Sequence, residues 1–467
     1  MSPHRPLWLG SLIAGLAIAN PAFAANSDEA RFEELEQKIK VLERKLEIQQ
    51  EEAASKAKTA PVIKTGDKGL SFETADGNYQ FKLNGLFQGD GRFFLDNGER
   101  KDLEDTFLLR RVRPTLQGQL GKYVGFRLTP EFAGDSATVV DAYVDLKFSP
   151  AATLRVGKQK GPVGLERLQS GGAIVFAERA FPTELAPNRD IGFQLQGDVL
   201  DNRLNYAVGI YNGTADGRDS PTSDADNEHE LGARVFLTPF VNNPGSALQG
   251  LGFGLGVSHG KKESEVVGVQ NSLLGRYRSP GQEQIFNYRN AAANFVTADG
   301  DHTRISPQFY YYRNSFGLIG EYITSEQALG KSNNAAIAEE LKHKAWQLTA
   351  SYVLTGEDNG FKGVAKPLNE FDLGKSGWGA FELAARVSKL EIDDKAFDGG
   401  ADSFAERHVA VSEARSYGLG LNWYLNANTK LVFDYFNTSF KDGAGVAAAP
   451  EDRDDEKVFI TRVQYQF

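Results

Sequence analysis

Hydrophobic and polar residues alternate with a period of two along most of the chain after about residue 69. From Trp346 to Leu354 every second residue is apolar, and the residues between them are mostly polar. The same alternation recurs at 204–210, 251–258, 417–425 and 459–467. A period of two places successive side chains on opposite faces of a β-strand. The pattern therefore predicts strands with one apolar face and one polar face.

Sixteen such strands are predicted, and their connections alternate in length. They begin near residues 79, 106, 122, 139, 152, 190, 203, 231, 251, 303, 315, 345, 379, 413, 429 and 456. Connections after even-numbered strands are mostly short and those after odd-numbered strands mostly long, with exceptions at 239–250 and 355–378. An even number of antiparallel strands with short turns at one rim and long loops at the other is typical of outer-membrane barrels. The expected fold is an all-β transmembrane barrel of about sixteen antiparallel strands over residues 69–467, and a soluble sandwich is the alternative.

The N-terminal region shows three different patterns. Residues 1–24 combine a basic start, a short apolar run and a small-x-small end, which predicts a cleavable signal peptide and export. Residues 25–54 carry a heptad seam, which predicts a short periplasmic coiled coil that supports a homotrimer; a single solvated helix is the alternative. Residues 55–68 are small, charged or proline and are expected to form a linker. The seam consists of Phe32, Leu35, Ile39, Leu42 and Leu46.

The amino-acid composition limits the kinds of site and partner that are expected for this chain. The chain has no cysteine, and its six histidines are scattered without metal-ligand spacing, so neither a metal site, a cofactor nor an enzyme is expected. A net charge of −10 argues against nucleic acid as a partner. A mean hydropathy of −0.39 together with 31 Phe, 16 Tyr and 49 Gly suits short alternating strands and tight turns.

Several short stretches, in order along the predicted strands, resemble the phosphate-selective porin O and P family. They are residues 109–113 (LRRVR), 141–146 (DAYVDL), 154–166 (LRVGKQKGPVGLE), 188–192 (NRDIG), 377–386 (GWGAFELAAR) and 420–426 (GLNWYLN). The resemblance implies a trimeric sixteen-stranded barrel in the outer membrane, whose third long loop folds inward and whose lumen binds phosphate through arginines and lysines. The third long connection, Lys160 to Arg189, is where that loop is expected.

Basic residues on the predicted inner faces are the candidates for anion binding. Strand parity places Arg111, Arg113 and Arg127 in the lumen, because alternate residues such as Val112 and Leu128 face lipid. Rings of Arg and Lys attract anions in pores, and guanidinium suits phosphate oxygens. Alternatively, each arginine pairs with an inward carboxylate such as Glu131, Asp141, Asp145 or Glu382 and only stiffens the wall. The full candidate set is Arg111, Arg113, Arg127, Arg155, Lys158, Lys160, Arg167, Arg179, Arg189 and Arg462.

The expected function is passive diffusion of small anions, phosphate or polyphosphate among them, through a homotrimer surrounded by outer-membrane lipid. Two alternatives stay open. The predicted loop, counted together with the adjoining Asp190, holds four basic residues and also Glu166, Glu178 and Glu184, so its formal charge is zero. This balance and the negative net charge favour a general porin for small hydrophilic solutes. A periplasmic all-β protein tethered through its coiled coil is the third possibility.

Overall fold

The computed structural model describes residues 25–59, 61–95, 103–224, 226–264, 273–291, 294–334 and 336–467. The predicted signal peptide, residues 1–24, lies outside the described residues. The chain forms two compact units, Met1–Pro61 and Val62–Phe467. No helix in the described ranges is both long enough and apolar enough to cross a membrane.

The N-terminal unit is one helix, α1 (Ala25–Thr59). All five side chains of the predicted seam are more than half exposed, from 52% for Ile39 to 69% for Phe32. An exposed apolar stripe of this kind suits burial against another helix. The coiled coil itself stays a prediction. Residues 55–68, expected to be a linker, include the end of α1 and strand β1 (Val62–Gly66).

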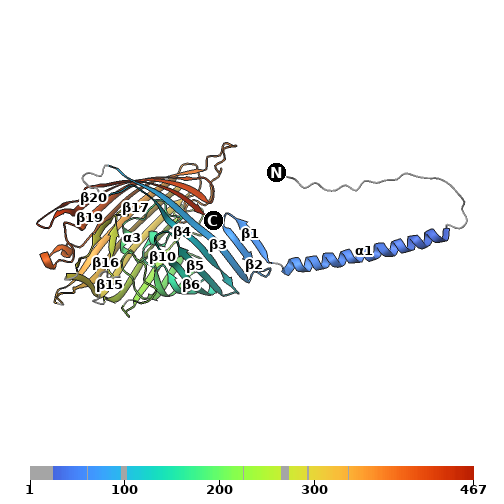
Figure 1. Ribbon diagram of the computed structural model, residues 1–467, viewed down its shortest axis with the longest axis horizontal. Coiled ribbons are helices and arrows are strands. Elements are labelled where there is room, and N and C mark those ends of the chain that lie inside the picture. Colours follow the sequence, from blue (N-terminus) through green and yellow to red (C-terminus); the bar gives the residue numbers. More distant parts are fainter. Residues whose placement is uncertain are drawn as a thin grey trace. The chain divides into compact units, whose positions relative to one another are not determined.

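The second unit is a closed antiparallel barrel (Figure 1). In the described residues, sixteen consecutive neighbours form the wall, and pairing of the last strand with the first closes it. The prediction of a sixteen-stranded antiparallel barrel is confirmed. The wall strands are β3 (Tyr79–Phe94), β4 (Thr106–Leu120), β5 (Val124–Glu131), β6 (Thr138–Ser149), β7 (Ala152–Gln159), β8 (Asp190–Val199), β9 (Leu204–Tyr211), β10 (Glu230–Leu237), β11 (Leu251–Glu263), β15 (Asn294–Arg313), β16 (Phe316–Lys331), β17 (Ala338–Val353), β18 (Ala380–Glu391), β19 (Val411–Tyr424), β20 (Thr429–Val446) and β22 (Glu456–Gln466).

The alternation of the sequence appears as alternation of burial. Along β17, Gln347 and Thr349 are buried inside the barrel, whereas Leu348 and Tyr352 are 41% and 52% exposed on its outer surface. The apolar side chains therefore face the lipid, and the polar ones face the lumen, which is the reverse of a soluble sandwich.

Two strands are longer than predicted. β15 begins at residue 294 and β17 at residue 338, against expected starts of 303 and 345. Residues 338–344 are mostly charged on the outer face, so no apolar alternation signals a strand there. Pairing with β16 nevertheless extends as far as Ala338. These strands therefore continue beyond the apolar part of the wall.

The sequence pattern does not predict the shorter strands and helices. β2 (Gly69–Glu73) pairs with β1 on one side and with β3 on the other. The remaining short elements lie in connections: α2 (Leu165–Leu168), α3 (Pro182–Leu185), β12 (Arg276–Arg278), β13 (Gln284–Asn287), β14 (Asn290–Ala291), η1 (Asp394–Phe397), η2 (Gly400–Asp402) and β21 (Ala449–Asp452).

The connection between β7 and β8 (residues 160–189), here called the inner loop, folds into the barrel. Leu165 and Phe176 are almost completely buried, and the ring of Phe176 lies 5.4 Å from that of Phe436 on β20. Glu321 on β16 accepts hydrogen bonds from the backbone N–H groups of Leu165 and Glu166 at 2.6 and 3.2 Å. The inward fold expected for the third long connection is therefore present.

A second connection also reaches the inner loop. The 355–378 segment was an exception to the short-turn rule, and the Phe361 carbonyl within it accepts a hydrogen bond from Gln169 Nε2 at 2.8 Å. Asn359 donates to Ser351 and Glu382, which lie on the wall strands β17 and β18. Part of this long turn is thus folded back against the inner surface of the barrel.

Candidate functional site: a cationic cavity inside the barrel

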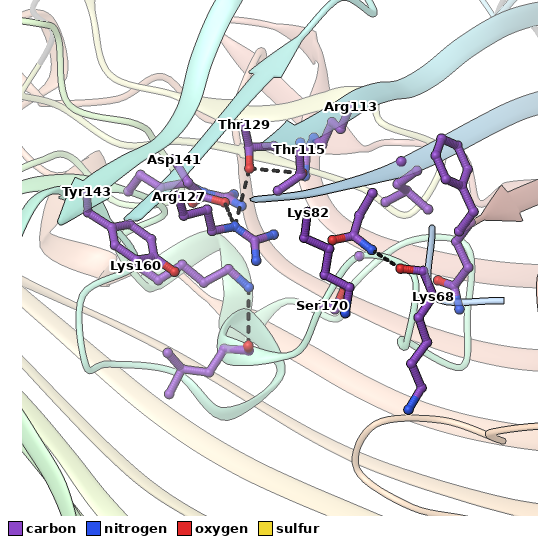
Figure 2. A pocket seen from close by; sticks show the side chains of 18 of the residues that line it. Lys68, Lys82, Arg113, Thr115, Arg127, Thr129, Asp141, Tyr143, Lys160 and Ser170 are labelled. Carbon is purple, nitrogen blue, oxygen red and sulfur yellow. Dashed lines mark hydrogen bonds and ion pairs between the residues drawn. The ribbon is translucent and has the colours of Figure 1, made fainter. Parts of the chain in front are cut away.

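A cavity of about 600 Å³ lies inside the barrel (Figure 2). The tip of the inner loop borders it at Ser170 and Gly171, and the C-terminal residue Phe467 borders it as well. Among the residues that the structure describes, two acidic residues line it, Asp67 and Asp141. Seven described basic residues line it: Lys68, Lys82, Arg113, Arg127, Arg155, Lys160 and Arg189. The cavity wall is therefore strongly basic although the whole chain is acidic.

Carboxylates neutralise part of this charge. Arg113 Nε donates to Glu131 Oε2 at 2.5 Å. Arg155 makes a two-point contact with Asp145, with Nε at 2.7 Å and Nη2 at 3.0 Å from the two carboxylate oxygens. The guanidinium of Arg155 also lies 3.8 Å from the centre of the Tyr143 ring. For these arginines the wall-stiffening alternative describes the geometry well.

The carboxylate of Asp141 forms ion pairs with two arginines. Arg189 Nε lies 3.2 Å from one of its oxygens, and Arg127 Nε lies 3.5 Å from the other. The Arg127 side chain is 35% exposed, and its hydrogen bonds go to the neutral side chains of Gln117 and Thr129 at 3.0 and 3.3 Å. One carboxylate shared by two guanidiniums leaves a positive excess at this point.

Lys160 begins the inner loop and is held by neutral groups. Its Nζ donates to the backbone carbonyls of Gln169 and Leu168 at 2.7 and 3.2 Å. Burial and the nearby Arg189 and Arg179 lower the pKa of Lys160 well below its ordinary value. In Figure 2 Lys82, Arg127 and Lys160 lie around the same space although they come from β3, β5 and the loop. Within the described residues neither Lys82 nor Lys160 makes an ion pair, and Arg127 shares the carboxylate of Asp141 with Arg189.

Four other predicted arginines do not line the cavity. Three of them belong to the inner loop or bond to it, and Arg111 is linked to it through Gln88, which donates to the Gly171 carbonyl. Arg111 is buried and donates to Gln88 at 2.5 Å. Arg167 donates to Asn188 and Thr183, and Arg179 donates to the carbonyls of Glu166 and Gln169. Arg462 donates to Asp90 on β3 and to the Ala177 carbonyl of the loop.

Lys158 lies on the other face of the wall, so its prediction as a pore-lining residue is wrong. It pairs with Ala142 and Ile191, and Ala142 pairs in turn with the outward-facing Leu128. Its Nζ donates to the Ser220 carbonyl at 3.0 Å. Three positions separate Lys158 from the inward-facing Arg155, and an odd separation along a strand reverses the face.

Two important basic residues were missed by the sequence analysis. Lys82 lies between Phe81 and Leu83, which are 42% and 39% exposed, so parity on β3 indicated its inward direction. Arg110 faces inward because of a β-bulge: Gln88 pairs with Arg111 and Gly89 with Leu109, so Arg110 is the extra residue. No simple alternation predicts this direction.

Arg110 belongs to a buried ionic cluster that fixes the inner loop. Glu178 of the loop accepts from Arg110 at 2.6 and 2.9 Å and from Arg92 at 2.8 Å, and Arg462 lies 3.4 Å away. These guanidiniums hold the pKa of Glu178 well below its ordinary value, against the effect of burial. Arg386 on β18 fixes the loop from a different part of the wall by donating to Glu166 at 2.6 Å.

Comparisons with known proteins agree with this architecture. Porin O of Pseudomonas aeruginosa is 24% identical over 426 residues, which cover 87% of this chain and 92% of Porin O. The outer membrane channel DcaP of Acinetobacter baumannii superposes with a TM-score of 0.53 at 11% identity, over 85% of this chain and 99% of DcaP. OmpT of Vibrio cholerae, in its trimer form, gives a TM-score of 0.50 at 11% identity, over 84% of this chain and 100% of OmpT.

The profile of one protein family covers most of the barrel. The family described as "Phosphate-selective porin O and P" matches residues 81–467, which include every wall strand from the third residue of β3 onward. The chain therefore belongs to the phosphate-selective porin O and P family and is an outer-membrane β-barrel porin, a channel and not an enzyme.

Proposed function

We propose that this porin conducts small anions and that groups of the phosphate type bind weakly in the cationic cavity. The observation that carries the proposal is the lining of the cavity, in which seven of the described residues are basic and two are acidic. Lys82, Arg127 and Lys160 contribute strongly, because Lys82 and Lys160 make no ion pair with a described residue and Arg127 shares the Asp141 carboxylate with Arg189.

The size of the effect follows from Coulomb's law. A fixed charge at about 4 Å from an ion contributes about 1 kcal/mol in bulk-like water and about 4 kcal/mol at an effective dielectric near 20. Even the smaller value changes partitioning about fivefold. Conduction also needs the ion to leave, so the account requires weak, saturable binding.

Phosphate and polyphosphate are the anions that the site suits best. Guanidinium groups present parallel donors that match pairs of phosphate oxygens. The cavity of about 600 Å³ has room for more than one phosphate group. The description of the family as phosphate-selective supports the same choice.

One set of contacts favours a general porin as the second candidate. Arg113, Arg155 and Arg189 each have a carboxylate partner within 3.2 Å, and these pairs contribute little net field. In that case neutral solutes and cations pass as readily as anions.

Two matched triple variants separate the candidates. Lys82, Arg127 and Lys160 are replaced by Gln inside the cavity. In the control, Lys344, Arg415 and Lys441, which face outward on β17, β19 and β20, are replaced by Gln, so that the total charge changes equally. Chloride conductance in a planar bilayer is titrated with inorganic phosphate. The cavity variant should lose phosphate block and the control should keep it. Equal block in both variants would favour the general porin.

For the assembly, we propose a homotrimer whose α1 helices form a periplasmic coiled coil. The exposed seam on α1 supports this, as does the trimer form of the structurally similar OmpT. Removal of residues 28–54 followed by light scattering in mild detergent tests the role of the helix.

A further inference from the structure

The outer surface of β17–β20 carries a group of basic residues at one edge of its apolar band. Lys344 on β17 and Lys441 on β20 are exposed, and the Arg415 side chain on β19 is 45% exposed. Arg415 has the same parity as the outward-facing Tyr417 and Leu419, which are 53% and 64% exposed. These three side chains, here called the outer basic row, therefore face away from the lumen.

Strand register brings the row together. Lys344 pairs with Glu391, Glu391 with Glu413, and Glu413 with Lys441, so these residues form one line across four strands. Arg415 lies one outward position further along β19. Because neighbouring strands are about 4.8 Å apart, the line spans about 14 Å. That length is comparable with a single lipid headgroup that carries two phosphates.

The row lies at the extracellular boundary of the membrane. Below it the outer face is apolar from Trp346 to Leu354 on β17 and from Tyr417 to Leu425 on β19. Nine residues tilted by about 45° cover roughly 20 Å, close to the height of the apolar band of such barrels. Trp346 and Tyr417 occupy the edge of this band, as aromatic residues do at membrane interfaces. The row lies on the side of the long loops, which is the extracellular side.

The charge of the row is not balanced by the barrel itself. The two nearby carboxylates, Glu391 and Glu413, already pair with Lys389 at 2.8 and 3.0 Å. Arg415 lies 3.8 Å from Glu413. Neither Lys344 nor Lys441 makes an ion pair with any residue that the structure describes. A positive excess therefore remains where lipid headgroups meet the wall.

We propose that the outer basic row binds the phosphate groups of phosphorylated glycolipids in the outer leaflet of the membrane. Lysine and arginine at an interface can direct their cationic ends to headgroups while their stems stay against the apolar wall. Paired cations on neighbouring strands hold such a phosphate from two sides, and a fixed site of this kind orders lipid around the β17–β20 wall. The inference rests on the outer-membrane barrel alone and does not depend on the anion preference of the pore.

The test measures lipid binding by the purified full-length protein. Rough-type lipopolysaccharide is titrated onto delipidated protein and counted by native mass spectrometry, in parallel with the same lipid after enzymatic removal of its phosphates. Replacement of Lys344, Arg415 and Lys441 by Gln should weaken binding of the phosphorylated lipid at least tenfold. The control replaces Lys122, Lys366 and Lys375, which are exposed on the opposite, short-turn rim, and should bind as the wild type does.

Two outcomes would overturn the proposal. The first is unchanged lipid binding by the outer-row variant, and the second is equal binding of phosphate-free lipid by the wild type. If the first outcome comes with loss of the oligomer, the surface is an interface between copies. Block of the chloride current by inorganic phosphate, recorded on the same variant, should be unaffected, and this separates the lipid site from the pore site.

Discussion

Arg462 and Asp90 join the last strand of the barrel to the first. They are directly paired across β22 and β3, and Nε and Nη2 of Arg462 donate to the two carboxylate oxygens of Asp90 at 2.6 and 2.7 Å. Both side chains are at most 1% exposed. The closure of the barrel thus contains a buried, two-point ion pair.

Replacement of Arg462 by Ala should therefore destabilise the closed barrel. The substitution leaves Asp90 buried without its main partner, a loss of about 3–5 kcal/mol for a buried pair. Arg203→Ala, which removes an exposed pair with Asp201, should cost less than about 1 kcal/mol. The temperature at which the folded band disappears in heat-modified gel migration measures both. Equal temperatures for the two variants would contradict the role of the pair.

A second prediction concerns the fixation of the inner loop. Glu178→Gln should loosen the loop, because Arg92 and Arg110 then lose a charged partner. Since the pKa of Glu178 in the folded protein is lowered, its contribution is present above the ordinary carboxyl pKa and is lost only as pH falls through the lowered value. Wild-type single-channel current should be quiet from neutral pH to about pH 5 and become noisy only in stronger acid, whereas E178Q should be noisy at neutral pH. A quiet E178Q channel would show that other contacts fix the loop.

A third prediction follows from the position of Lys160. Its lowered pKa means that the ammonium loses its proton at lower pH than an exposed lysine does. Anion preference should therefore decline at a lower pH than the pH at which ordinary lysines titrate. Lys160→Arg, which stays charged, should remove this decline, and permeability ratios measured from pH 6 to pH 10 test both. The same decline in K160R would place the titrating group elsewhere.

The helix gives a fourth prediction. Leu35→Asn together with Leu42→Asn places polar groups in the seam and should lower the thermal stability of the trimer, while the barrel stays inserted. Glu36→Gln with Glu43→Gln, outside the seam, is the control. Light scattering and heat-modified migration report the result. A monomeric wild type, or equal stability of both variants, would contradict the coiled coil.

Alternation and parity predicted much of this structure because one side of each wall strand faces lipid. Most predicted strand starts lie within two residues of the observed ones, and parity placed Arg113, Arg127 and Arg155 inside correctly. Parity fails at Arg110, where a bulge changes the face, whereas it places Lys158 on the outer face, against the prediction that Lys158 lines the pore.

The contents of the lumen could not be predicted in the same way. Whether an inward arginine lines the cavity or fixes the loop depends on contacts between distant segments, such as Arg386 with Glu166 and Arg462 with Ala177. No local pattern encodes these contacts. The turn residues Asp67 and Lys68 line the cavity because β2 pairs with β3, and this pairing has no signal in the alternation.

The reversal potential of the wild-type protein in a planar bilayer under a potassium chloride gradient tests the central claim most directly. The basic excess in the cavity predicts a potential with the sign of chloride preference, and one that moves toward zero when Lys82, Arg127 and Lys160 are replaced by Gln. A wild-type potential at zero, or with the sign of potassium preference, would contradict the account of this protein as an anion-selective porin.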